Sequence, residues 1–237
     1  MSQNEDRLKA AAANSAAALV ADGMIVGLGS GSTAAFAVAA LGKRFHQGLH
    51  FAGIPTSEVT AAQARALGIP LADLADVAHI DLTIDGADEV EEGTLNLIKG
   101  HGGALLREKI VASVSKRLVI VVDESKLVHR LAARFPVPVE VVQFGWQTTA
   151  RQLSNLGAIL SLRRAPTGDP FVSDGGHYIL DCAFDPSVAA VLLARELDHV
   201  VGLVEHGLFI GLTSEVHLAS AGGVRVITCA RADPNNF

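Results

Sequence analysis

The chain has 237 residues, of which 49% are hydrophobic and 19% charged, and its formal net charge is −6. This composition is typical of a folded globular protein and excludes a mostly disordered chain. It also argues against a general nucleic-acid binder, which gathers Lys and Arg to neutralise phosphates. The length suffices for one large domain, or for a main domain with a smaller one.

The first half of the chain alternates helical and strand-like segments. An alanine-rich helix is expected over residues 5–23, ended by Gly23. A short strand and a glycine turn follow, and the next helix starts with Ser32 or Thr33 as its N-cap. The alternation continues with strands over 49–57, 80–89 and 117–126 and helices over 58–68 and 103–116. This order predicts a parallel sheet with helices on both faces.

The second half has a different texture, beginning at the two prolines of "RFPVPVEV". Its segments predict strand, helix, strand, strand and helix, with "DGG" at 174–176 as a hairpin signal. Apolar runs at 208–216 and 224–230 then return to the main sheet. We therefore expect an α/β fold, with a main domain of residues 1–133 and 207–237 and a small α+β domain of residues 134–206.

The two cysteines, Cys182 and Cys229, form no CxxC motif and have no histidine at metal-ligand spacing. They are expected to be buried small apolar residues, and neither a disulfide nor a metal site is predicted. The polar start "MSQNEDRLKA" lacks the features of a secretory signal, and no apolar stretch of about 18 residues suggests a membrane span. A cytoplasmic protein without membrane contact is the expectation.

Polar residues gather where the predicted strands end. The stretch "GLGSGST" lacks the lysine of a P-loop and does not match GxGxxG, so dinucleotide binding is not indicated. Its backbone N–H groups and hydroxyls, at the start of a helix, could still form a cup for phosphate. A tight turn with a serine cap explains the same residues. In parallel α/β sheets these strand ends meet at one edge, where ligands bind.

Four charged residues suggest proton transfer. Asp85 and Asp88 follow a strand in "DGAD", and Lys99 and Glu108 lie further along in "LIKGHGGALLREKI". A carboxylate base beside an ammonium suits proton abstraction next to a carbonyl, because the cation stabilises the enediolate oxygen. Alternatively, the aspartates cap a loop and Glu108 belongs to a surface charge cluster.

Taken together, these segments resemble the A-type ribose-5-phosphate isomerases. The resemblance rests on "MIVGLGSGSTA", "GIPTSEVT", "LTIDGADEV", "LIKGHGGALLREKI", "VVDESKLV" and "FPVPVEV", in the order of the family and at nearly its spacing. It covers most of residues 9–145. It implies a Rossmann-like main domain with a smaller ferredoxin-like domain, assembled as a homodimer or tetramer.

The resemblance also implies an activity and a site. The activity is the interconversion of D-ribose 5-phosphate and D-ribulose 5-phosphate through an enediolate, in the nonoxidative pentose phosphate pathway, without metal or cofactor. Glu108 would be the base, Lys99 would stabilise the developing oxyanion, and Asp85, with Asp88 beside it, would assist ring opening and proton movement. The full set of implied substrate-binding residues is Lys9, Ser30, Gly31, Ser32, Thr33, Asp85, Gly86, Ala87, Asp88, Lys99, Gly100, His101, Gly102 and Lys126.

The chain departs from the family pattern at a few positions. His101 stands where the family usually has Gly, Ser30 where it often has Thr, and Leu106 where it often has Thr. An extra residue between Asp88 and Lys99 is expected in the "EEGT" turn. His101 matters most, because its side chain either points away from the loop or reshapes the pocket and the choice of pentose phosphate.

Other functions remain open at this stage. A sugar-phosphate sensor of related fold is one, although such a regulator would normally carry a DNA-binding helix-turn-helix, for which the termini have neither room nor basic charge. An isomerase with a shifted phosphosugar preference is another. A lactonase or amino-sugar isomerase of similar fold fits less well, given "DGAD" and "KGHGGALLREK" together.

Overall fold

The structure, a computed structural model, describes residues 3–228. Its largest sheet has the strand order β14-β13-β6-β3-β1-β2, in which only the edge strand β14 pairs antiparallel. The strands are Ile25–Leu28 (β1), Ala52–Pro55 (β2), Leu82–Asp85 (β3), Leu118–Asp123 (β6), Glu215–Ser220 (β13) and Gly223–Thr228 (β14). The predicted α/β class with a parallel main sheet is confirmed.

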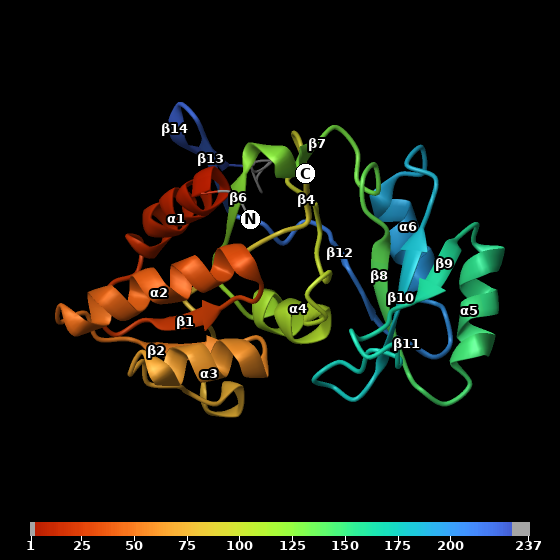
Figure 1. Cartoon of the computed structure of the whole chain (residues 1–237), viewed down its shortest axis with the longest axis horizontal. Coiled ribbons are helices and arrows are strands. Elements are labelled where there is room, and N and C mark those ends of the chain that lie inside the picture. Colours follow the sequence, from red (N-terminus) through yellow and green to blue (C-terminus); the bar gives the residue numbers. More distant parts are fainter. Residues whose placement is uncertain (1–2, 229–237) are drawn as a thin grey trace, which may run out of the picture.

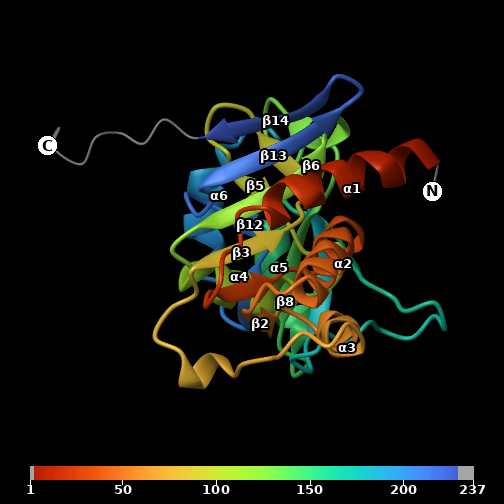
Figure 2. The same cartoon turned by 90° about the vertical axis from the view of Figure 1, so that its left-hand side faces the viewer.

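Helices cover both faces of this sheet. The helices α1 (Gln3–Ala17) and α2 (Ser32–His46) pack side by side through buried alanines on one face (Figures 1 and 2). On the other face lies α4 (Leu105–Ser113), where Val111 packs against Ile54 and Ile80. The helix α3 (Glu58–Ala66) follows β2, and Ser57 caps it by accepting the Thr60 N–H. Figure 1 shows α4 between the main sheet and the smaller unit, so its residues can serve a site at that junction.

The first helix ends earlier than its sequence suggests. It stops at Ala17, whereas Gly23, with φ of +78°, lies in the turn before β1. The reason is a contact distant in sequence: the Arg44 guanidinium of α2 donates to the carbonyl oxygens of Ala17 and Val20. A side-chain cation therefore replaces the glycine cap that was predicted.

A second, antiparallel sheet has the order β11-β8-β10-β9. Its elements are Val137–Val141 (β8), Ile159–Leu162 (β9), Tyr178–Ala183 (β10) and Leu203–His206 (β11), with the helices Trp146–Asn155 (α5) and Ala190–Leu197 (α6). The turn at "DGG" is closed by the Gly176 N–H, which donates to the Ser173 carbonyl. It lies within a longer connection, residues 163–177, and does not join β9 to β10 directly. The division into domains at residues 133/134 and 206/207 stays a prediction.

A third sheet, β12-β5-β4-β7, was not anticipated. Its strands are Glu89–Glu91 (β4), Leu97–Ile98 (β5), Leu127–Val128 (β7) and Leu208–Phe209 (β12), and it shares a core with the main sheet around Phe209 and Ile120. The predicted run 208–216 is therefore split, its first part joining this sheet and its last part starting β13. Single turns of 3-10 helix cover Leu74–Asp76 and Glu124–Lys126.

Two further sequence predictions concern buried cysteines and the membrane. Cys182 is buried in the core of the smaller unit, as expected. Cys229 lies outside the described residues. Among residues 3–228, no helix combines the length and the apolar character that crossing a membrane would need.

Candidate active site

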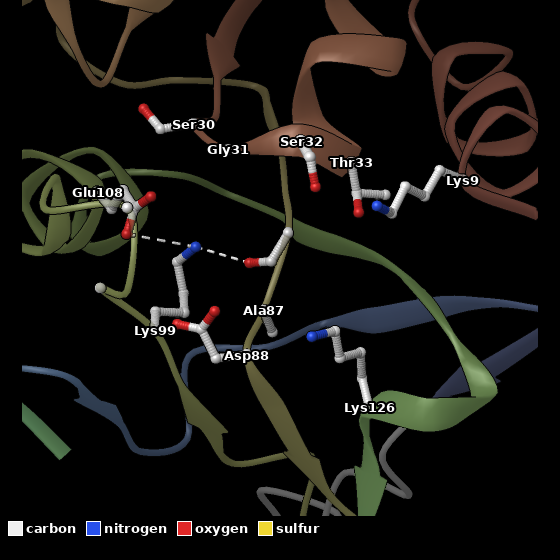
Figure 3. Close-up of a pocket in the computed structure, with 13 residues that line it drawn as sticks. Lys9, Ser30, Gly31, Ser32, Thr33, Ala87, Asp88, Lys99, Glu108 and Lys126 are labelled. Atoms are coloured by element: carbon white, nitrogen blue, oxygen red, sulfur yellow. Dashed lines mark hydrogen bonds and ion pairs between the residues drawn. The ribbon is translucent and has the colours of Figure 1, made fainter. Parts of the chain in front are cut away.

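A cavity of about 120 Å³ opens at the carboxyl ends of the parallel strands, as the sequence predicted (Figure 3). The residues after β1 and β3 form two of its walls, and the stretch 99–102 with Glu108 of α4 forms a third. Its lining consists of Lys9, Ser30, Gly31, Ser32, Thr33, Gly86, Ala87, Asp88, Lys99, Gly100, Gly102, Glu108 and Lys126. Asp85 and His101 are the predicted site residues that do not line it.

A buried ammonium lies between two carboxylates at one end of the cavity. The Lys99 Nζ is 3.0 Å from Asp85 Oδ2 and 3.4 Å from Glu108 Oε2, and it donates to the Gly86 carbonyl oxygen at 2.6 Å. None of the three side chains is more than 6% exposed. One positive charge thus faces two negative ones in a medium that screens them poorly.

This arrangement shifts the pKa values of all three groups. Burial raises the pKa of Glu108 to about 8; the Lys99 ammonium opposes the rise, and the charges of Asp85 and Asp88 add to it. Burial likewise raises the pKa of Asp85. Burial alone would lower the pKa of Lys99, but the two carboxylates outweigh it and raise the pKa above its ordinary value. Glu108 is consequently poised to exchange a proton near neutral pH.

Asp85 lies beneath the cavity and holds its floor together. Its Oδ1 accepts the backbone N–H groups of Ser30 (3.1 Å) and Gly86 (2.8 Å), while its Oδ2 pairs with Lys99. Gly29 is required beside it, because a Cβ there would lie 2.2 Å from Asp85 Oδ1. In this structure Asp85 is a partner of Lys99, and Asp88 is the aspartate whose side chain reaches the cavity.

His101 turns its side chain away from the cavity. Its ring packs edge-on against Phe135, with centroids 4.8 Å apart, and its Nε2 lies 3.4 Å from the Pro136 carbonyl oxygen. The φ of His101 is not positive, since Gly100 before it, at +107°, makes the turn. The His101 backbone N–H donates to Asp88 Oδ2 at 3.0 Å. A side chain at this position thus leaves the cavity open.

For the isomerase activity that the sequence resemblance implies, we therefore expect His101→Gly to leave kcat and KM within about threefold of the parent, as for substitutions away from a site. Glycine keeps the N–H that Asp88 uses and removes only the contacts of the ring with Phe135 and the Pro136 carbonyl, which lie away from the cavity. Steady-state kinetics on the two pentose 5-phosphates check this. A tenfold or larger change in KM, about the effect of one lost hydrogen bond to a charged group, would place the imidazole in the pocket.

The loop of residues 29–33, here called the first glycine loop, presents backbone donors to the cavity. The helix α2 starts at Ser32 after Gly31, without the side-chain cap that was predicted from Ser32 or Thr33. The Ser30 hydroxyl is turned away, into contacts with the hydroxyls of Thr56 (2.7 Å) and Ser57 (2.8 Å). The first N–H groups of a helix have no partner within it, so this end of α2 suits an anion.

Two lysines flank the same end of the cavity. Lys9 of α1 and Lys126, which follows β6, lie across the cavity from Glu108, and Lys9 points toward Thr33 (Figure 3). The Lys126 Nζ also lies 5.2 Å from the centroid of the Phe135 ring. The cavity is therefore basic at one end and carries the Glu108 and Lys99 pair at the other.

Some site contacts had no sequence signal. Phe135, which contacts both His101 and Lys126, belongs to the matched "FPVPVEV" segment but was not singled out. Thr60, whose hydroxyl donates to the Gly29 carbonyl at 3.0 Å, likewise belongs to a matched segment, "GIPTSEVT", and was not singled out. Among residues 3–228, no group of three or more His, Cys, Asp or Glu side chains is arranged to hold a metal ion.

Comparison with known proteins gives one consistent family. The sequence profile described as ribose 5-phosphate isomerase A (phosphoriboisomerase A) matches residues 52–223. The ribose-5-phosphate isomerase A of Synechococcus sp. (strain JA-3-3Ab) is 56% identical over 223 residues, which cover 94% of this chain and 97% of that protein. That of Gloeobacter violaceus is 57% identical over 227 residues, covering 96% and 98%.

Solved structures agree with the sequence comparison. The ribose 5-phosphate isomerase A of Methanocaldococcus jannaschii has a TM-score of 0.91 at 39% identity, covering 94% of this chain and 99% of that one. A D-ribose-5-phosphate isomerase in complex with phospho-erythronic acid has a TM-score of 0.92 at 35% identity, covering 95% and 100%. The likeness therefore extends over nearly the whole chain.

Proposed function

The chain belongs to the ribose-5-phosphate isomerase A family and interconverts ribose 5-phosphate and ribulose 5-phosphate, and we propose that Glu108, Lys99 and Asp88 carry out this reaction. The observation that carries the proposal is the buried Lys99 between Asp85 and Glu108, at the end of the cavity away from Lys9 and Lys126. A sugar phosphate bound with its phosphate between those two lysines would bring its carbonyl end to Glu108.

The proposed chemistry is a proton transfer between neighbouring carbons. Glu108 removes the proton from C2 of the open-chain aldose, the C–H electron pair forms the C1–C2 double bond, and the C1 oxygen gains negative charge. The Lys99 ammonium stabilises that oxygen. Glu108 then returns the proton to C1, while the proton of the C2 hydroxyl passes to the C1 oxygen, so that a carbonyl forms at C2 and a hydroxyl at C1. A carboxylate whose pKa lies near the pH of the solution can both accept and donate this proton.

The two aspartates receive different roles from their positions. Asp88 lines the cavity, and we assign to it the proton movements among the sugar hydroxyls and in ring opening. Asp85 is buried below the cavity and acts by holding Lys99 and the N–H groups of Ser30 and Gly86. We therefore propose that Asp88, and not Asp85, contacts the sugar and assists ring opening and proton movement.

The raised pKa of Glu108 predicts a pH dependence. As a base it must be ionised, so kcat/KM should rise with pH through the Glu108 pKa of about 8. Substrate phosphate ionises near pH 6, so the informative range lies above pH 7. We expect kcat/KM to increase about eightfold between pH 7 and 8.5. A profile that is flat over this range would mean that Glu108 titrates at its ordinary value or is not the base.

The phosphate should be recognised by charge. We predict that free D-ribose has a kcat/KM lower than that of its 5-phosphate by about 10²-fold or more, since hydrogen bonds to charged groups contribute about 1.5–3 kcal/mol each. Lys126→Met keeps the stem beside Phe135 but removes the charge, and should raise KM about tenfold for the phosphate only. Kinetics on both sugars test this. Equal losses for ribose and its phosphate would reject a phosphate role for Lys126.

Three proposals rest on the family alone. A relative was solved with phospho-erythronic acid, and we propose that this chain likewise binds phosphorylated sugar acids in the cavity. We propose assembly into a homodimer or tetramer. A cytoplasmic location also remains a proposal.

A further inference from the structure

One arginine of the smaller unit contacts the backbone of the stretch 99–102, which forms a wall of the cavity. Arg163 directly follows β9, and its Nη1 donates to the carbonyl oxygens of Gly100 (2.8 Å) and His101 (3.1 Å). These two residues belong to the stretch 100–103, here called the second glycine loop. We infer that Arg163 is a positioning residue for the isomerase reaction, which holds the second glycine loop, and with it Lys99, in the geometry that the chemistry needs.

The guanidinium is itself held in place. Its Nε donates to Asp181 Oδ2 at 3.0 Å, and its Nη2 donates to the other oxygen of the same carboxylate. The Arg163 side chain is 13% exposed and that of Asp181 is 20% exposed. A two-point pair of this kind fixes the plane of the guanidinium. The two Nη1 hydrogens can then be directed only at the loop carbonyls.

One peptide group of the loop is gripped from both sides. The carbonyl oxygen of Gly100 accepts from Arg163, while the N–H of the same peptide, on His101, donates to Asp88 Oδ2 at 3.0 Å. The Gly100 carbonyl also accepts the Gly103 N–H at 3.0 Å, which closes the turn. Because three of the four loop residues are glycines, the backbone would otherwise have many conformations available. Rotation of this peptide would aim its carbonyl at the Asp88 carboxylate.

Neighbouring contacts seat the same connection on the main domain. The Phe171 ring packs on Gly103, where a Cβ would lie 2.5 Å from the ring. The Phe171 N–H donates to the Arg163 carbonyl at 2.9 Å, and the Asp174 carboxylate accepts the Glu58 N–H at 2.9 Å. Arg163 is thus part of a packed junction between the two units.

Arg163 does not line the cavity, so it acts through the loop and not on the sugar. Lys99 directly precedes the gripped peptide, and Gly102 of the cavity wall follows it. A loosened loop should misplace Lys99 relative to the reacting oxygen, at the end of the cavity remote from Lys9 and Lys126. The loss should therefore appear in kcat, with KM nearly unchanged. This role rests on the proposed function of Lys99.

The test uses Arg163→Met and the double variant Arg163→Met/Asp181→Leu in the full chain. Replacing a buried ion pair by apolar side chains of similar size is often neutral for stability, so the double variant should fold even if the single one does not. We expect both, where folded, to lose about 10- to 10²-fold in kcat, the usual effect of a small misplacement, with KM changed less than about threefold. Ethylguanidinium at millimolar concentration should restore part of the kcat of Arg163→Ala.

The matched control is Arg164→Met. Arg164 is exposed and donates to the Gly168 carbonyl within its own turn, so its loss should leave kcat unchanged. If the folded double variant keeps the parent kcat while Lys99→Met is inactive, the role of Arg163 is wrong and that of Lys99 stands. If the folded double variant and Lys99→Met both keep the parent kcat, the proposed role of Lys99 fails as well. A loss in KM alone would make Arg163 a binding residue and also overturn the inference.

Discussion

Glu108→Gln is expected to lower kcat by about 10²-fold or more, because general base catalysis contributes about 10²- to 10⁴-fold. Glutamine keeps the size of Glu108 but cannot accept the C2 proton. The cavity walls and the basic end with Lys9 and Lys126 stay as they are, so KM for ribose 5-phosphate should change little. Substrate would still bind, but no base would accept the C2 proton.

Steady-state kinetics measure this effect, and calorimetry with phospho-erythronic acid checks that the site still binds. Glu92→Gln is the matched control, because Glu92 does not line the cavity and pairs with the exposed His129. It should behave like the parent. Turnover close to that of the parent in Glu108→Gln would remove Glu108 from the role of base.

Lys99→Met should lower kcat by about 10²- to 10³-fold, the typical cost of removing one donor to a developing oxyanion. It should also destabilise the fold, since Asp85 and Glu108 lose the ammonium that both face. The sign of the pH effect follows from the raised pKa values of these acids. The stability that the protonated acids contribute is fully present below the pKa values that Asp85 and Glu108 have in the unfolded chain. It is lost as the pH rises through their raised pKa values in the folded protein.

The Tm of Lys99→Met should therefore fall further below that of the parent at pH 8 than at pH 5. Measuring kcat at a temperature where the variant is folded separates the effect on the reaction from the effect on stability. Lys116→Met, which removes a surface lysine paired with Asp81, is the control for a lost ion pair. An unchanged kcat with weaker substrate binding would make Lys99 a substrate clamp.

The sequence alone was informative about where the site lies. Because the carboxyl ends of parallel strands meet at one edge of a sheet, the sequence alone predicts that the residues after β1, β3 and β6 lie together. Ser32, Asp88 and Lys126 indeed line one cavity. Glycines at fixed places and charged residues in long motifs carry enough information to identify both the fold and the family.

Side-chain directions were beyond the sequence, because partners distant in the chain decide them. The Ser30 hydroxyl points to Thr56 and Ser57, residues that follow another strand, and Asp85 is drawn beneath the cavity by Lys99. The end of α1 is fixed by Arg44, and the third sheet consists of strands two or three residues long, too short to show periodicity.

Arg163 is the extreme case. It lies 62 and 63 residues away from the two carbonyls that it holds, in a segment without any recognised motif. Its meaning depends on Asp181 fixing the guanidinium and on Asp88 holding the other side of the same peptide. Only the packing of the two units against each other reveals it.

Proton exchange with solvent tests the central claim most directly. Ribose 5-phosphate is incubated with the purified protein and EDTA in D₂O for many turnovers, and the pentose phosphates are then examined by NMR. Proton transfer by Glu108 through an enediolate predicts turnover with deuterium accumulating on C1 of ribulose 5-phosphate, because the proton held by the carboxyl exchanges with solvent in part of the turnovers, and turnover and labelling should both be about 10²-fold slower in Glu108→Gln. Turnover with complete retention of hydrogen, or turnover that EDTA abolishes, would contradict the account.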